Sequence, residues 1–320
     1  MSELAPETRL WNMLRGALAT KALGAVADLG VAEQLADGPR DVASIAEQSG
    51  SDPQTLHRIL RALASDGVFA EDEPGVFRNT ESSELLRRDA KGSWPEFAHL
   101  FAGVFYGGAG TLDPTTRAET FTRAFDADFW SWLAQHPSER ATFDGAMGGG
   151  KEGPASRLAG LEWRDNETVV DVGGGNGALL TALLTEIPGV RGVILDLPET
   201  DRDEDTLGER ITFVAGSFFE EVPSGDAYIL SGILHDWDDE AATKILNTIR
   251  AAARPQARLL VVDAVIPPGN EPHGNKWLDL LMLVLAGGRE RTEPEWRSLL
   301  EGAGFEPIAV EDGLVQARCR

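Results

Sequence analysis

The chain has 320 residues, of which 42% are hydrophobic and 25% are charged, a composition that is ordinary for a globular protein long enough to form two domains. Its formal net charge of −23 opposes binding to nucleic acid and to anionic membranes, and no run of about 18 apolar residues indicates a membrane span. Cys319 is the only cysteine, which excludes an internal disulfide or a cysteine-based metal site, and the acidic N-terminus lacks a secretion signal, so we expect a cytoplasmic protein.

Residues 1–92 are predicted to form a first domain of short helices. A long first helix carries one apolar stripe, made of Leu10, Leu14, Leu18, Leu23 and Val26. This stripe presents more apolar surface than a small domain buries alone. We therefore expect a homodimer that forms through this domain, with an extensive and largely apolar interface.

A winged helix follows the first helix within the same domain. Its expected elements are two helices and a two-stranded wing, over residues 42–48, 56–64, 68–70 and 76–77. Asp52 as the N-cap and Pro53 at the first helical position predict the start of the second of these helices.

The charges on the wing argue against DNA binding, which is a common function of winged helices. The wing carries Glu71, Asp72 and Glu73 where a phosphate-facing wing needs lysine or arginine. We interpret the domain as a packing or dimerisation module and expect no nucleic-acid partner.

Residues 93–320 are predicted to form a second domain, and its first part, up to about Gly150, is rich in aromatic residues. These side chains suit core packing, and some of them suit the wall of an aromatic pocket. The residues that we expect to line a substrate pocket of this kind are Trp130, Phe143, Met147 and, further along the chain, Met282.

Strands and helices alternate from residue 168 onward. Strands are expected at 167–171, 191–196, 211–215, 226–231 and 257–263, and helices at 175–186, 238–253 and 293–302. A last pair of strands, 307–310 and 314–317, is joined by a Glu-Asp-Gly turn that favours a hairpin. This order predicts an α/β fold, a doubly wound Rossmann-like sheet with a C-terminal antiparallel hairpin and with ligands at the carboxyl ends of its parallel strands.

The stretch V-V-D-V-G-G-G-N-G-A-L over residues 169–179 runs from a buried strand through glycines into a helix, so its backbone can approach a ligand closely. From Gly173 it satisfies the dinucleotide pattern G-x-G-x-x-A, and Asp196 follows about 20 residues later, which suggests NAD. From Asp171 it also reads D-x-G-x-G-x-G, with an acid that repels pyrophosphate and attracts an ammonium group. The loop alone leaves both cofactors open.

Four segments together resemble the S-adenosylmethionine (SAM) dependent O-methyltransferases, the class that includes plant caffeate- and isoflavone-type enzymes, hydroxyindole O-methyltransferase and bacterial antibiotic-tailoring enzymes. They are D-V-G-G-G-N-G (171–177), L-D-L-P (195–198), S-G-I-L-H-D-W-D-D-E (231–240) and G-G-R-E-R-T (287–292), followed by Gly304-Phe305. The resemblance covers nearly the whole chain, because the family also has an N-terminal winged-helix dimerisation domain. The last two segments are more specific than the glycine loop and favour SAM over NAD.

The resemblance implies SAM as cofactor, S-adenosylhomocysteine (SAH) as product, and no metal. In the family, the acid that corresponds to Asp196 accepts hydrogen bonds from the ribose hydroxyls. The chain departs from the family at Ser217, where many relatives have an acid near the adenine amine, and at Ser231, where plant enzymes have a lysine. The residues expected at the cofactor are Asp171, Gly173, Gly175, Asp196, Leu197, Ser217, Phe218, Ser231 and Trp237.

The resemblance further implies that His235 is the general base, and that Asp263 and Glu290 orient and polarise it. A carboxylate bonded to one ring nitrogen fixes the tautomer and stabilises the imidazolium. Transfer of a proton from a phenol with a pKa near 10 to an imidazole near 6.5 is uphill by about 5 kcal/mol. Coupling to methyl transfer, or a raised histidine pKa, reduces this gap.

We therefore expect an enzyme that transfers a methyl group from SAM to a hydroxyl of a small aromatic natural product, polyketide-like or phenolic, in antibiotic biosynthesis. Two alternatives remain open. One is methylation of a nitrogen or a carboxylate on a similar scaffold, and the other is use of SAM for decarboxylation, hydroxylation or pericyclic chemistry. The acidic charge and the set of His235, Asp263 and Glu290 disfavour a non-enzymatic winged-helix regulator.

Overall fold

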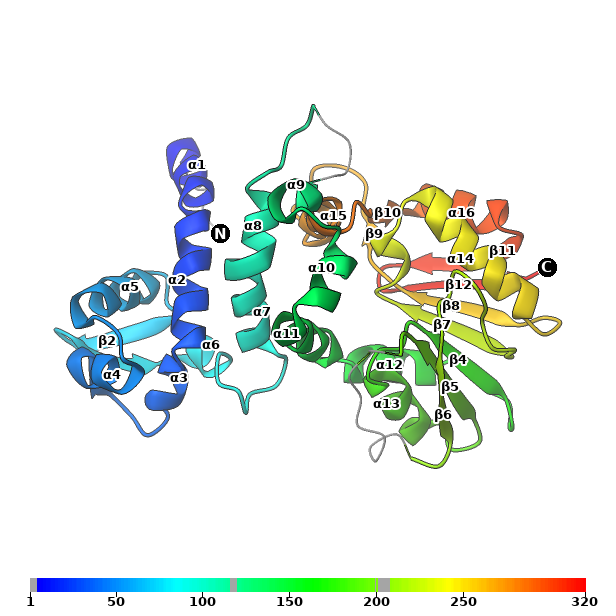
Figure 1. The fold of residues 1–320 in the computed structure, drawn as a ribbon, viewed down its shortest axis with the longest axis horizontal. Helices are drawn as coiled ribbons and strands as arrows, with labels where there is room; N and C mark the ends of the chain where they lie inside the picture. Colours follow the sequence, from blue (N-terminus) through cyan, green and yellow to red (C-terminus); the bar gives the residue numbers. More distant parts are fainter. Residues whose placement is uncertain (1–4, 116–119, 199, 201–207) are drawn as a thin grey trace. The chain divides into compact units, whose positions relative to one another are not determined.

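A computed structural model describes residues 5–115, 120–198, 200 and 208–320, and the chain divides into two compact units (Figure 1). The first unit comprises Met1–Gly110 and Ser138–Gly149, and the second Thr111–Pro137 and Gly150–Arg320. The domain boundary expected after residue 92 remains a prediction. Among the helices of the described residues, none is long and apolar enough to cross a membrane.

The first unit is mainly helical and contains a small sheet in the order β1-β3-β2. Its elements are α1 (Pro6–Leu14), α2 (Gly16–Asp28), α3 (Val31–Gln34), β1 (Arg40–Asp41), α4 (Val42–Ser49), α5 (Pro53–Ser65), β2 (Phe69–Glu73), β3 (Val76–Asn79), α6 (Glu81–Glu84), α7 (Trp94–Leu100), the π-helix η1 (Phe101–Phe105), α8 (Tyr106–Ala109) and α11 (Pro137–Gly148). The predicted winged helix is confirmed over α4, α5, β2 and β3. Asp52 begins α5 as predicted, because its side chain accepts a hydrogen bond from Thr55 N at 2.7 Å.

The predicted long first helix is wrong, because the chain forms two helices that meet at Arg15. Arg15 stays in the right-handed helical region (φ −75°, ψ −9°), but the regular helix is interrupted there. Its guanidinium pairs with Asp66, and the glycine that follows it has low helix propensity. The break divides the apolar stripe. Leu14 and Leu18 are 75% and 76% exposed, whereas Val26 is buried in the core of the unit.

The second unit contains a seven-stranded sheet within its described residues, in the order β11-β12-β8-β7-β4-β5-β6. Its strands are β4 (Thr168–Val172), β5 (Arg191–Asp196), β6 (Ile211–Ala215), β7 (Ala227–Ser231), β8 (Arg258–Val262), β11 (Phe305–Glu311) and β12 (Leu314–Cys319). The central strands are parallel, and β12 pairs antiparallel with both β8 and β11. The predicted doubly wound sheet and its C-terminal hairpin are confirmed.

Helices and two short strands complete the second unit. They are α9 (Thr120–Phe125), α10 (Phe129–Gln135), α12 (Glu152–Ala159), α13 (Ala178–Glu186), the 3-10 helix η3 (Leu234–Asp236), α14 (Asp239–Ala252), β9 (Val265–Ile266), α15 (Asn275–Leu285), β10 (Arg291–Thr292) and α16 (Glu293–Gly302). The helix expected from residue 175 begins only at Ala178. The reason is that three glycines before it adopt positive φ and cannot belong to a right-handed helix.

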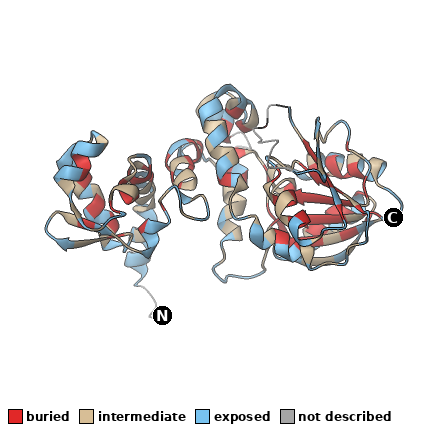
Figure 2. Cartoon of the chain, turned by 90° about the horizontal axis from the view of Figure 1, so that it is seen from below, coloured by how far each residue is buried: buried red, intermediate tan, exposed pale blue. Residues whose placement is uncertain are grey.

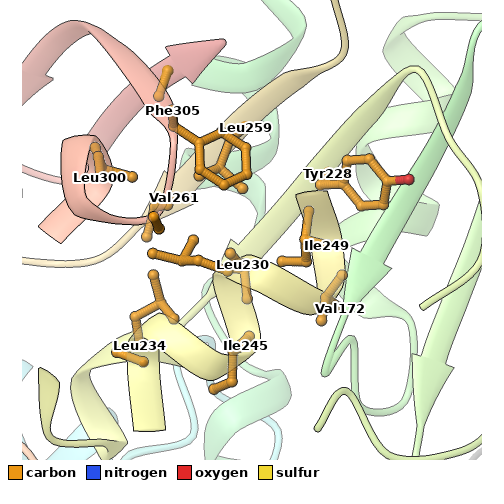
Figure 3. Packing of buried hydrophobic residues seen from close by; sticks show 14 of the residues in the cluster. Val172, Tyr228, Leu230, Leu234, Ile245, Ile249, Leu259, Val261, Leu300 and Phe305 are labelled. Carbon is orange, nitrogen blue, oxygen red and sulfur yellow. The ribbon is translucent and has the colours of Figure 1, made fainter. Parts of the chain in front are cut away.

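Successive side chains along each strand point to opposite faces of the sheet, so the hydrophobic core is divided between these two faces. Val172, Leu230 and Val261 pack with α14 and α16 on one face (Figure 3), whereas Val169 and Leu260 pack with α12 and α13 on the other. Figure 2 shows the resulting continuous burial of the central strands. A parallel sheet that is covered on both faces leaves the carboxyl ends of its strands as the place where polar side chains can meet a ligand.

Candidate active site

The glycine loop lies between β4 and α13, at the carboxyl edge of the sheet. Gly173, Gly175 and Gly177 have φ values of 72°, 57° and 83°. A Cβ on Gly173 would lie 2.5 Å from Cδ1 of Ile233 and 3.5 Å from the ring of Phe218. Only glycine fits this position, and the backbone of the loop is therefore open to a ligand.

Asp171 lies under this loop at the end of β4 and is 1% exposed. Burial raises the pKa of its carboxyl to about 7, Asp196 adds to this effect, and the positive charge of Lys151 opposes it. Its Oδ2 has no hydrogen-bond partner among the described residues. A buried hydrogen-bond acceptor without a donor destabilises the folded protein. This oxygen therefore fits the ammonium group of a cationic ligand, which would supply the donor.

Asp196 ends β5 and connects this strand to the loop. Its Oδ2 accepts a hydrogen bond from Gly175 N at 2.7 Å, and its Oδ1 accepts from Leu197 N at 2.7 Å and from the Thr200 hydroxyl at 2.6 Å. A carboxylate offers about four lone pairs, so these bonds leave capacity for a further donor such as a ribose hydroxyl. Leu197 is 40% exposed beside it.

Aromatic rings lie next to the loop on the side of β6. Phe218 and Trp237 have ring centroids 6.2 Å apart, and Phe219 is 4.8 Å from Trp237 in an edge-to-face arrangement. The Ser217 hydroxyl accepts a hydrogen bond from Phe219 N at 3.3 Å, and Ser231 ends β7. We call the rings of Phe218, Phe219 and Trp237 the aromatic wall. Together with the glycine loop and the unpartnered Oδ2 of Asp171, this wall fits the zwitterionic and aromatic ends of SAM.

His235 lies on η3, just after β7, and its Nδ1 is 2.7 Å from Glu290 Oε1. Burial by itself lowers the pKa of His235, but Asp236, the hydrogen bond to Glu290, and Asp263 together raise it to about 10. Burial also raises the pKa of Glu290, and this outweighs the attraction of the nearby imidazole.

Asp263 and Asp236 complete the acidic surroundings of the imidazole. Asp263, just after β8, accepts a hydrogen bond from Gly232 N at 2.8 Å and acts on His235 through its charge rather than through a direct bond. Asp236 Oδ1 lies 3.7 Å from His235 Nε2, and burial raises the pKa of Asp236 to about 7. Sequence reasoning missed Asp236, although it follows the histidine directly in the L-H-D-W segment.

The G-G-R-E-R-T segment holds the histidine turn by its backbone. Arg289 N donates to His235 O at 2.8 Å, and a Cβ on Gly288 would lie 2.1 Å from that same oxygen. Arg291 is fully buried and donates to Leu234 O and Trp237 O, both at 2.9 Å. The two most specific segments of the sequence thus form one structural unit, and Arg291 is a second residue that sequence reasoning missed.

The predicted pocket residues fall on both compact units. Trp130 lies on α10 with its ring 5.1 Å from that of Phe129, and Met282 is buried on α15, both in the second unit. Phe143 and Met147 lie on α11, in the first unit. The composition of the acceptor pocket therefore stays a prediction. Across the described part of the chain, no group of three or more His, Cys, Asp or Glu side chains is arranged to hold a metal ion.

Comparisons with known proteins agree over both parts of the chain. A family model of the O-methyltransferase domain matches residues 108–306, and one of the O-methyltransferase dimerisation domain matches residues 11–89. A phenazine O-methyltransferase of Lysobacter antibioticus is 37% identical over 97% of this chain and 95% of its own. An 8-amino-8-demethylriboflavin N,N-dimethyltransferase of Streptomyces davaonensis is 36% identical over 90% of this chain and 87% of its own. The crystal structure of human N-acetylserotonin methyltransferase in complex with SAM has a TM-score of 0.86 at 25% identity, covering 100% of this chain and 99% of its own.

Proposed function

The chain belongs to the O-methyltransferase family, and from this membership we propose that it transfers the methyl group of SAM to a hydroxyl of a small aromatic natural product, with His235 as the general base. The observation that carries the proposal is the 2.7 Å hydrogen bond between His235 and Glu290, at the same sheet edge as the glycine loop. When bound, SAM supplies a methyl group activated by a positively charged sulfur.

The electrostatics of His235 suit the removal of a phenolic proton. A pKa raised to about 10 brings the imidazole close to the ordinary pKa of a phenol, which is about 10, so the uphill gap of about 5 kcal/mol becomes smaller. Glu290 holds Nδ1 and leaves Nε2 to face the acceptor. The hydroxyl proton moves to Nε2 as the oxygen attacks, and the resulting imidazolium is stabilised by the carboxylates around it.

Mass spectrometry after incubation with SAM tests this function on a panel of phenols and polyketides, together with arylamines and aryl carboxylic acids of the same ring systems. We expect the phenols to gain one methyl group. Selective methylation of the amines would favour N-methylation instead, which the riboflavin-type relative makes the strongest alternative. Loss of CO₂ or a rearranged product without a methyl gain would indicate use of SAM without methyl transfer.

The raised pKa of His235 predicts an unusual pH profile. Below the pKa, the fraction of His235 in the neutral, basic form increases about tenfold per pH unit. We therefore expect kcat/KM for a neutral phenol to keep rising above pH 7. The sulfonium of bound SAM lowers the pKa from about 10, and the plateau should fall between 6.5 and 10. Initial rates measured from pH 6 to 10 show at which pH the plateau begins. A plateau at 6.5 or below would contradict the effect that we assign to the three carboxylates.

Asp196→Ala is expected to weaken SAH binding by about 1.5–3 kcal/mol, because it removes hydrogen bonds to a charged group. The variant also frees Gly175 N from its bond to Asp196, so thermal unfolding must show that the sheet remains intact. Calorimetry with SAH and NAD measures the effect. Unchanged SAH affinity, or tight NAD binding by the wild type, would contradict the cofactor assignment.

We further propose that the homodimer forms through the apolar face of α1 and the start of α2, which lies partly within the matched dimerisation segment. This face consists of Leu10, Trp11, Met13, Leu14 and Leu18, which are 59–76% exposed in the single chain. Light scattering should give twice the mass of one chain at micromolar concentration. The double change Leu14→Glu and Leu18→Glu should give the mass of one chain, whereas Ile308→Glu, at an exposed site of β11, should leave the dimer intact. A wild-type monomer would refute the proposal.

A further inference from the structure

Three charged side chains beside the glycine loop do not pair with one another. Lys151 is half-buried just before α12, and Asp171 and Asp263 are 1% and 4% exposed at the ends of β4 and β8. The Oδ2 atoms of both acids have no hydrogen-bond partner among the described residues. The Lys151 ammonium likewise makes no ion pair or hydrogen bond with any other described residue.

These charges nevertheless act on each other through space. Burial lowers the pKa of Lys151, and the nearby Asp171 and Asp263 oppose that shift. In the sheet, β7 lies between β8 and β4, so the strands that carry the two acids are about 10 Å apart, or two strand spacings. Lys151 therefore lies near enough to both acids for their charges to act on it, although it contacts neither of them.

Unpaired buried charges of both signs indicate a ligand that itself carries both signs, because each buried charge without a partner is costly. A phosphate suits Lys151 but is repelled by Asp171. A simple cation suits Asp171 but is repelled by Lys151. A zwitterionic amino acid satisfies both, with its ammonium at one residue and its carboxylate at the other.

We propose that Lys151 binds the α-carboxylate at the amino-acid end of SAM, opposite Asp171, which takes the α-ammonium. This inference rests on the proposed function. The order along the sheet edge supports it, because Asp196 ends β5 and Phe218 follows β6, and both strands lie on the other side of Asp171 from β7. The nucleoside end then lies toward β6, and the amino-acid end toward β7 and Lys151.

Three thioethers, in all of which the sulfur is uncharged, test this assignment by calorimetry. SAH carries both ends of the amino acid, S-adenosyl-3-thiopropylamine lacks the carboxylate, and 5′-methylthioadenosine lacks the amino-acid charges altogether. Lys151→Met should weaken SAH binding by roughly tenfold to hundredfold, the range for a lost hydrogen bond to a charged group. The same variant should bind the other two ligands as tightly as the wild type, within about twofold. The wild-type preference for SAH over the thiopropylamine should thus disappear.

Two further variants control the measurement. Lys151→Arg should keep the preference for the carboxylate, and Lys91→Met, an equivalent change at an exposed site, should change nothing. Thermal unfolding shows whether Lys151→Met is folded, and Lys151→Gln replaces it if it is not. Equal weakening of all three ligands, or unchanged SAH affinity with slower turnover, would overturn the assignment. If the wild type bound no SAH at all, the proposed function itself would fail.

Discussion

Replacement of His235 with alanine is expected to reduce turnover by about 10²–10⁴-fold, the usual range for loss of a general base. SAH affinity should change little, because we propose that the imidazole faces the acceptor and that the cofactor contacts belong to the glycine loop, Asp196 and the aromatic wall. Single-turnover rates with saturating SAM, together with calorimetry of SAH, separate the two effects. Near-normal turnover would mean that proximity alone drives transfer to an acceptor already ionised in solution.

The two supporting acids should have smaller and unequal effects. Glu290 bonds the ring directly at 2.7 Å, whereas Asp263 bonds Gly232 and reaches the ring only through its charge. We therefore expect Glu290→Gln to slow turnover more than Asp263→Asn, and both to slow it less than His235→Ala. Either change combined with His235→Ala should add little, because groups that act as a unit are not additive. Full additivity would contradict the assignment of these acids to His235.

Replacement of Arg291 with methionine is expected to destabilise the fold by about 2–5 kcal/mol, because two backbone acceptors lose their donor in a buried place. These acceptors are Leu234 O and Trp237 O, which flank the turn that carries His235 and Asp236. The guanidinium also pairs with Asp239 at 2.9 Å, and it lies 5.3 Å from the centre of the Trp296 ring. Urea unfolding followed by circular dichroism measures the loss.

Arg297→Met is the matched control for this prediction. Arg297 lies on the neighbouring helix α16, is 42% exposed and pairs with Glu293 at the surface. Exposed ion pairs of this kind contribute about 0–1 kcal/mol. If both variants unfolded at the same urea concentration, Arg291 would not stabilise the turn as we infer.

Much of the sheet could be predicted from the sequence because buried parallel strands are short apolar runs with glycine or an acid at their ends. Asp171, Asp196 and Asp263 each stand at or just after such a run, and parallel strands bring their carboxyl ends to one edge. The glycine loop did not by itself identify a cofactor, since its spacing fits two patterns. The more specific segments around His235 and Glu290 decided in favour of SAM.

Other features could not be predicted because they depend on contacts between distant residues. The break at Arg15 accompanies an ion pair with Asp66, which lies 51 residues away. Arg291 looks like a surface residue between two polar neighbours, and only the fold buries it. The sequence around Lys151 did not mark it as a site residue, because the acids whose charges act on it come from β4 and from the segment after β8.

The two-residue ladder of β9 and β10 has a consequence for how this enzyme can diversify. It pairs Arg291 with Val265 and Thr292 with Ile266, so the chain after Asp263 and the chain after Glu290 run in fixed parallel register. The segment between the two strands contains α15, with the predicted pocket residue Met282. We expect substitutions on α15 to reshape the proposed acceptor pocket without altering the spacing of the two acids, whereas a single inserted residue next to Asp263 or Glu290 would shift it. We therefore expect changes on α15 to alter the choice of acceptor while the proposed set of His235, Asp263 and Glu290 stays in place.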